Sequence, residues 1–178
     1  MHPIKTLEDN TRLIEIYLLR VAAYENSAQH KFINSKRYPK GLYDSLDKQS
    51  VHYIIEEKGR IIAAARASII DNLRIIPYFE LFQDLTISLD EPFWFYSKLV
   101  VHPDYRGQGV GEKVNKHILS SLDSKKAKTI LFTAKSSKDQ AFKDLGCSLL
   151  KALDNIHHKA YPYDPEKKTS IFLKYIED

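Results

Sequence analysis

The segment from Leu99 to Gly111, LVVHPDYRGQGVG, constrains the fold of this chain more than any other. An apolar stretch runs into a Pro-Asp turn and then into a loop in which every second residue is glycine. Apolar residues then recur at helical spacing, at Val110, Val114, Ile118 and Leu122. This order predicts a strand, a tight loop and an amphipathic helix in direct succession.

The three glycines of the loop, Gly107, Gly109 and Gly111, predict a binding site for an anion. Glycine permits positive φ values and has no Cβ atom to keep a ligand away from the backbone. The helix that follows leaves its first N–H groups unpaired, and the positive end of its dipole favours a diphosphate. A P-loop is excluded because no Gly-Lys-Ser/Thr closes the segment, and the glycine spacing does not fit the dinucleotide fingerprint.

The pattern Arg106-x-x-Gly109-x-Gly111 after LVVHPDY resembles the acyl-CoA signature of the GNAT superfamily of N-acetyltransferases. The resemblance implies that acetyl-CoA or another acyl-CoA is the co-substrate, and that Leu99, Val100 and Val101 face its pantetheine arm. It assigns the diphosphate to Arg106, Gly107, Gln108, Gly109, Val110 and Gly111. The resemblance also implies that Lys138 and Phe142 belong to the residues that bind the co-substrate.

Composition and length set the broad class of the protein. At 178 residues the chain is expected to form one domain over 1–178, with a hydrophobic fraction of 43% and a charged fraction of 28%. No apolar run approaches the roughly 20 residues of a membrane span, and no signal peptide is recognised. One cysteine, Cys147, fits a cytoplasmic protein and is expected to pack in a strand.

The hydrophobic pattern predicts an α/β fold with strands and helices in alternation. The expected helices cover 6–25, 78–83, 109–122 and 138–145, and the expected strands cover 51–56, 60–70, 93–101, 128–134, 147–153 and 169–176. Thr6 is expected to cap the first helix, and Gly146 to end the last one. The strands over 51–56 and 60–70 are expected to form a hairpin through 57–59, with the second strand central in the sheet, and 71–92 shows no clear pattern apart from the helix at 78–83. Loops are expected over 26–50 and 154–168. The order resembles the GNAT fold, which implies a single-domain mixed sheet with helices on both faces and splayed central strands.

Acyl transfer to an amine needs an anchored donor, a deprotonated amine and a hydrogen bond to the developing oxyanion. In many members of the resembled family a tyrosine protonates the leaving thiolate, and Phe142 stands at that position here, without a proton to give. Other candidates for proton transfer are Glu80, Tyr96, Ser97 and His102. We take Tyr96 first, because it precedes the strand that the pantetheine is expected to follow.

Arg66 lies in an otherwise apolar strand, so it requires a buried partner such as Asp44 or Asp47. The layout Tyr43-Asp44-x-x-Asp47-x-x-Ser50-x-His52, with Arg66 on the next strand, resembles autoinducer synthases and N-acyl amino acid synthases. Those enzymes make N-acyl homoserine lactones or N-acyl amino acids. Two interpretations of Arg66 stay open, an ion pair that orders the loop and a role in binding the acceptor.

The loop after 153 carries His157, His158, Tyr161 and Tyr163, and we take His157 and Tyr161 as candidates for binding the acceptor. No metal is expected, because adjacent histidines point apart and no further ligands complete a shell.

The sequence therefore predicts an N-acyltransferase that acts on a primary amine of a small molecule or peptide. The alternative is a catalytically silent acyl-CoA sensor, and Phe142 favours it. The lysines at 125, 126, 128, 135 and 138 indicate a solvated face or attraction of a polyanionic co-substrate. The net charge of +4 does not call for nucleic acid, and no membrane partner is expected. The acceptor, the acyl length and a homodimer are left open.

Overall fold

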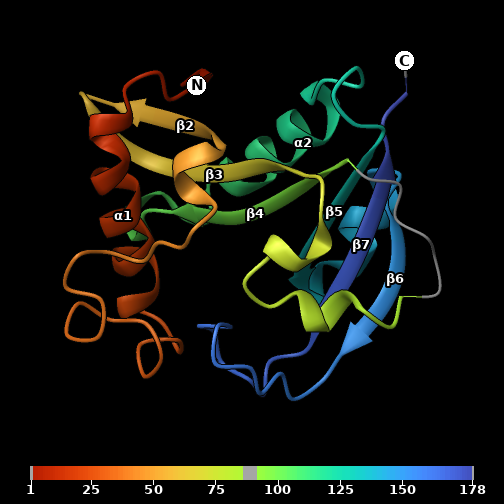
Figure 1. Ribbon diagram of the computed structural model, residues 1–178. Coiled ribbons are helices and arrows are strands. Elements are labelled where there is room, and N and C mark those ends of the chain that lie inside the picture. Colours follow the sequence, from red (N-terminus) through yellow and green to blue (C-terminus); the bar gives the residue numbers. More distant parts are fainter. Residues whose placement is uncertain (1, 86–91, 178) are drawn as a thin grey trace. The chain divides into compact units, whose positions relative to one another are not determined.

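The computed structural model describes residues 2–85 and 92–177, which form a mixed α/β fold (Figure 1). Hydrogen bonds join its strands into one open sheet in the order β1-β2-β3-β4-β5-β7-β6. The strands are β1 (Ile4–Thr6), β2 (Val51–Glu57), β3 (Arg60–Ile70), β4 (Phe93–Val101), β5 (Thr129–Lys135), β6 (Ser148–Leu153) and β7 (Thr169–Tyr175). The helices are α1 (Leu13–Glu25), α2 (Val110–Ser121) and α3 (Asp139–Asp144). The predicted α/β class is confirmed.

The chain divides into two compact units. The first comprises residues 1–67 and 98–118, and the second comprises 68–97 and 119–178. Strands β3 and β4 and helix α2 each contribute residues to both units.

The first unit is built on the hairpin of β2 and β3, which the sequence predicted. Lys58 and Gly59 join the two strands with φ values of 49° and 78°, and a two-residue turn of type I′ requires positive φ at both positions. Almost every residue of β3 is buried, as expected of a central strand. Helix α1 lies beside this hairpin (Figure 1), and its Ile16 and Leu19 pack in one apolar cluster with Ile54 of β2.

The expected helix over 6–25 begins later than predicted. Residues Ile4–Thr6 form β1, which pairs antiparallel with β2, and a 3-10 turn over Asn10–Arg12 precedes α1. Asp9, not Thr6, caps this turn, because its carboxylate accepts the Thr11 amide at 2.8 Å. The exposed edge of β2 therefore takes up residues that the sequence pattern assigned to the helix.

The segment over 26–50 is irregular apart from a 3-10 turn at Asp47–Gln49, as predicted. Gly41 lets this segment approach α1 closely, since a Cβ atom on it would lie 2.4 Å from the Cβ of Tyr17. The Leu42 amide donates to the Tyr17 carbonyl at 3.0 Å. Backbone contact with the helix therefore holds a segment that has no regular structure of its own.

In the second unit, β5 lies between β4 and β7 in the sheet. Trp94–Tyr96 of β4 pair in parallel with Ile130–Phe132, while β7 pairs antiparallel with both β5 and β6. Figure 1 shows β7 between β5 and β6. Helix α3 ends at Gly146 as predicted: Gly146 has φ 75°, and the Cys147 amide donates to the Phe142 carbonyl at 3.0 Å.

Two further expectations in the second unit need correction. The helix expected over 78–83 is a 3-10 turn, Phe79–Phe82, and a second turn covers Leu73–Ile75. Strand β6 begins at Ser148, because the amide of Cys147 closes the end of α3. The stretch over 71–92 that the sequence left without a clear pattern falls partly, at 86–91, outside the described residues.

Alanine substitutions at Gly41 and Gly59 separate two contributions to the free energy of unfolding. One is the strain of a positive φ, and the other is the close approach of Gly41 to Tyr17. Both glycines have positive φ, but a Cβ on Gly59 would have no heavy atom within 4 Å. We expect Gly59→Ala to lower the free energy of unfolding by about 1 kcal/mol, the cost of a left-handed alanine. Gly41→Ala should cost about 1 to 3 kcal/mol more, because it also forces the segment away from Tyr17. Urea unfolding measures both, and equal losses would contradict the close approach.

Candidate functional site

The loop between β4 and α2 is fixed at its start by a short 3-10 turn, Pro103–Tyr105. Proline at its first position supplies the φ value that the turn needs, and the His102 amide donates to the Ile62 carbonyl at 2.8 Å. The Arg106 amide donates back to the Pro103 carbonyl at 3.2 Å. The chain therefore leaves the sheet in a defined direction and reaches the glycines from a rigid base.

Two of the three glycines adopt a positive φ value. Gly107 and Gly109 both have φ 73°, and an added Cβ would meet no heavy atom within 4 Å at either position. Gly111 lies within α2, and its Cβ would be in ordinary contact with Val101 at 3.7 Å and Leu99 at 3.9 Å. Gly111 therefore does not use the positive φ that glycine permits, and its surroundings leave room for a Cβ atom.

The backbone amides of this loop are available to an external acceptor. Among the hydrogen bonds of the described chain, none occupies the amides of residues 107 to 111, and Gly107, Gln108 and Gly109 are exposed. The Lys113 amide makes the first helical bond, to the Gly109 carbonyl at 3.0 Å. Open N–H groups at the positive end of a 12-residue helix favour an anion. The chemistry of these donors fits a diphosphate.

The side chains of Arg106 and Gln108 face the protein rather than completing the cradle. The Arg106 guanidinium donates to the Ala23 carbonyl near the end of α1, where the helix dipole favours a cation. The side-chain amide of Gln108 donates through Nε2 to the backbone carbonyl of Asp104 at 3.1 Å. Both residues bring their backbone to the loop, while their side chains stiffen it.

The hairpin of β2 and β3 also contacts the turn that precedes the glycines. The Tyr105 hydroxyl donates to Glu57 at the end of β2, and Arg60 at the start of β3 contacts the His102 ring at 2.7 Å. His102 is therefore engaged in positioning the turn. His102 was also a candidate for proton transfer, and its contact with Arg60 does not support that role.

Arg66 has the buried partners that the sequence predicted. Its side chain is 0% exposed, and its two terminal nitrogens lie 2.5 Å and 3.2 Å from the two carboxylate oxygens of Asp44. Asp47 lies 3.1 Å from the same guanidinium, and Arg20 of α1 donates to both Asp47 oxygens, at 2.8 Å and 2.9 Å. Paired donors of this kind offset part of the cost of burying the charges.

Lys98 joins Arg20, Asp44, Asp47 and Arg66 in one buried charge cluster. Its Nζ lies 3.5 Å from Asp44, and its side chain is 4% exposed. Sequence reasoning missed both Lys98 and Arg20, although the signal was the one that exposed Arg66. Each is a charged residue at a position where the apolar pattern places a core residue.

The cluster shifts the pKa values of its members. Burial alone would raise the pKa of Asp47, but the hydrogen bonds and charges of Arg20 and Arg66 outweigh it and lower this pKa to about 2. Burial lowers the pKa of Lys98 to about 8, because the two arginines and the two carboxylates around it largely cancel. Burial also lowers the pKa of His52, whose Nε2 lies 2.8 Å from the Asp47 carbonyl.

Tyr96, the first candidate for proton transfer, lies in the second unit on β4. It is buried, and its ring centroid is 5.7 Å from that of Phe132. Burial raises the pKa of the phenol, so it stays protonated at neutral pH and does not act as a base. The neighbouring Ser97 is half-buried, and the exposed Glu80 pairs with His158 at 3.1 Å.

The aromatic loop of the second unit places its two acceptor candidates differently. Tyr161 is half-buried, its ring centroid 5.6 Å from that of Tyr78, and its hydroxyl lies 3.3 Å from the Thr169 hydroxyl. His157 is exposed. No group of three or more His, Cys, Asp or Glu side chains that could hold a metal ion occurs within residues 2–85 and 92–177.

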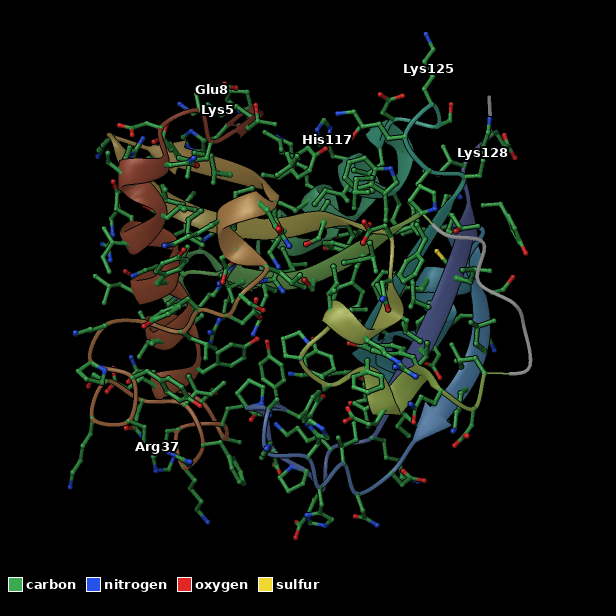
Figure 2. All side chains as sticks on the ribbon, viewed as in Figure 1. Lys5, Glu8, Arg37, His117, Lys125 and Lys128 are labelled. Carbon is green, nitrogen blue, oxygen red and sulfur yellow. The ribbon has the colours of Figure 1, made fainter. Side chains whose placement is uncertain are left out.

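Phe142 and Lys138 lie at α3 in the second unit. Phe142 is buried, with ring centroids 4.9 Å from Phe132 and 5.3 Å from Phe172. Lys138, at the start of the helix, is exposed. The lysines at 125, 126, 128 and 135 are exposed as well. Figure 2 shows the Lys125 side chain extending away from the ribbon. Cys147 is buried as expected, and burial raises its thiol pKa to about 11, which argues against a nucleophile.

The sequence profile of the acetyltransferase (GNAT) family matches residues 12–148, which include β4, the glycine loop, α2 and the charge cluster. This chain belongs to the GNAT family. Membership supports acyl transfer as the class of reaction. Among curated proteins, none matches the sequence. In the described part of the chain, no helix is long and apolar enough to cross a bilayer.

Solved structures show the same fold at low sequence identity. The ribosomal-protein-S18-alanine N-acetyltransferase of Escherichia coli is 16% identical with a TM-score of 0.62, covering 100% of this chain and 96% of its own. An N-acetyltransferase of Staphylococcus aureus Mu50 is 12% identical with a TM-score of 0.61, covering 99% of each chain. The CoA-dependent acyl-homoserine lactone synthase BjaI is 13% identical with a TM-score of 0.74, covering 99% of this chain and 84% of its own.

The buried charge cluster predicts a large effect from one conservative change. Asp47→Asn keeps the shape of the side chain but leaves Arg20 and Arg66 without the charge they contact. We expect the free energy of unfolding at pH 7 to fall by about 3 to 5 kcal/mol, as when a buried pair loses one partner. Glu112→Gln breaks the exposed pair with Lys116 and should cost less than about 0.5 kcal/mol. Urea unfolding compares the two.

The same variant carries a pH signature. Because the pKa of Asp47 is lowered in the folded protein, its stabilising effect is complete above the unfolded pKa, at about 4, and is lost as the pH falls toward 2. The stability difference between the wild type and Asp47→Asn should therefore be constant from pH 7 to about pH 5 and shrink below about pH 4. A difference that persists unchanged at about pH 2.5 would show that the carboxylate charge is not its source.

Proposed function

We propose that this protein is an N-acyltransferase that moves an acetyl group, or another acyl group, from coenzyme A to a primary amine. The observation that carries the proposal is the loop at residues 107 to 111, with open amides at a helix N-terminus and space where Cβ atoms would lie. This is the donor arrangement that a diphosphate requires. Family membership supports the reaction class.

The residues around the loop fit the rest of the co-substrate. A Cβ atom added to Gly111 would lie within 4 Å of Leu99 and Val101, so the end of β4 lies beside the first turn of α2, where the amides would hold the diphosphate. A pantetheine arm that follows Leu99–Val101 away from the loop carries its thioester toward Lys98. Most of the rate gain in such a reaction can come from holding the thioester and the amine together.

Proton transfer is assigned by what the side chains can do. Phe142 cannot protonate a leaving thiolate, whereas the Tyr96 phenol carries a proton at neutral pH. We therefore assign to Tyr96 the delivery of that proton. Arg66, His157 and Tyr161 remain candidates for the acceptor side, with Arg66 already engaged by two carboxylates.

A sensor that binds acyl-CoA without turnover is the second candidate function. The observation in its favour is that Phe142 stands where the family resemblance implies a tyrosine. Its ring packs against Phe132 and Phe172 and has no proton to donate. Binding of the donor is common to both functions, so only turnover separates them.

The loop itself is tested by calorimetry with acetyl-CoA. Gly109→Asp places a carboxylate at the open amides, where repulsion of the diphosphate should weaken binding by about a hundredfold or more. Gly59→Asp is the matched control, because Gly59 has a similar positive φ of 78° and the same open surroundings in a turn of the β2–β3 hairpin. The control should bind like the wild type. Equal binding by all three proteins would contradict the assignment of the loop.

Turnover is tested by thiol release from acyl-CoAs in the presence of amines. The panel should include peptides, polyamines and α-amino acids, with short and long acyl chains, because BjaI is described as an acyl-homoserine lactone synthase and the S18 enzyme acts on a protein alanine. Amine-dependent release identifies an enzyme. Tight binding of acyl-CoA with no release for any amine would favour the sensor.

A further inference from the structure

Lys98 is a buried lysine with an unusual backbone in the middle of the sheet. It lies in the interior of β4 with φ 60°, a left-handed value that residues other than glycine rarely adopt in a strand. Such a strained conformation persists only where the surrounding structure holds it, often at functional sites. The side chain is 4% exposed. Both features are costly, and apolar packing explains neither.

The orientation of β4 places Lys98 on the face that carries α1. The side chains of Leu99 and Val101 are the ones that a Cβ atom on Gly111 of α2 would meet, at 3.9 Å and 3.7 Å, whereas Val100 packs in the apolar cluster with α1. Lys98 shares the face of Val100, since its Nζ lies 3.5 Å from Asp44, in the segment that the cluster ties to α1. The residue therefore stands at the start of the stretch proposed for the pantetheine arm and turns its amine toward the buried charges.

The charges that surround Lys98 leave its amine able to change protonation state. The neighbouring charged groups come from α1, the irregular segment and β3, and are Arg20, Asp44, Asp47 and Arg66. Two cations face two carboxylates, so their effects on Lys98 largely cancel and burial decides the balance. Its pKa of about 8, well below the usual value for lysine, brings the loss of its proton close to neutral pH.

We propose that the Lys98 amine accepts the proton that the acceptor's ammonium group must lose before it attacks the thioester. This inference rests on the proposed function. An ammonium acceptor carries three protons on nitrogen. One passes to Lys98 Nζ as the nitrogen lone pair forms the bond to the carbonyl carbon. The carbon–sulfur bond breaks with its electron pair on sulfur, and the thiolate takes a proton from the proposed proton donor. That donor regains the second proton of the acceptor nitrogen, and the third proton stays on the amide nitrogen. Lys98 then releases its proton to solvent.

Lys98→Arg tests the proposal because arginine keeps the positive charge but does not release it at any working pH. With an acceptor that is an ammonium ion at neutral pH, we expect kcat to fall by about a hundredfold or more, as for loss of a general base. The rise of kcat with pH toward about pH 8 should disappear in the variant. Affinity for acetyl-CoA should stay within about threefold of the wild type. Lys116→Arg, on the exposed face of α2, should change nothing.

Hydroxylamine, which is neutral at pH 7, separates proton removal from structural damage. If Lys98 only takes up a proton, Lys98→Arg should lose less than about threefold in kcat with hydroxylamine while losing about a hundredfold with the ammonium acceptor. An equal loss with both acceptors, or retention of the kcat pH profile by Lys98→Arg or Lys98→Met, would overturn the inference. Absence of turnover in the wild type would instead remove the proposed function on which it rests.

A direct titration tests the protonation state without any acceptor. In protein labelled with carbon-13 at lysine Cε, the resonance missing from Lys98→Arg identifies Lys98. We expect it to titrate near pH 8, apart from the exposed lysines. A Lys98 amine that stays charged beyond pH 10 would contradict the proposal even if the enzyme turns over.

Discussion

The buried guanidinium of Arg66 is the constraint on which the first unit depends. A charge in the middle of a strand that is otherwise apolar would cost several kcal/mol if it stood alone, so the chain must bring anions to it. Asp44 and Asp47 come from a segment with almost no regular structure, and Asp47 in turn pairs with Arg20 of α1. One charge in β3 thus helps to position the irregular segment over 26–50, which hydrophobic spacing alone would leave undefined.

Helix α1 connects the charge cluster to the glycine loop within this unit. Arg20 on α1 belongs to the cluster, and three residues later the Ala23 carbonyl accepts a hydrogen bond from Arg106 at the start of the loop. Ile16 and Leu19 of the same helix pack in one cluster with Val100 of β4. The proposed donor loop and the buried charges therefore share one support, so a change that loosens α1 reaches both.

The sequence predicted the elements that depend on local backbone conformation. It failed for elements whose limits depend on contacts with residues far away in the sequence. The hairpin at Lys58–Gly59 and the end of α3 at Gly146 depend on backbone conformations that only a few residues adopt, so the sequence located both. The start of α1 was wrong because pairing with the edge of β2 captures Ile4–Thr6, and no local signal reveals such an edge. In the site, the partners of Arg66 followed from the cost of an unpaired buried charge. Lys98 was missed because the same reasoning was applied to one strand only.

The composition of the charge cluster explains why a lysine suits position 98 better than a third arginine. With Lys98 protonated, Arg20, Arg66 and Lys98 carry three positive charges against the two of Asp44 and Asp47, and His52, whose pKa is lowered by burial, adds none at neutral pH. Arginines keep their charge in proteins, so the excess can leave only from lysine. Because burial already favours the neutral amine, the fold needs no other device to make this proton exchangeable. Lys98 is therefore the member of the cluster from which a proton is most easily lost, and it lies in β4 directly before the stretch proposed to hold the pantetheine arm.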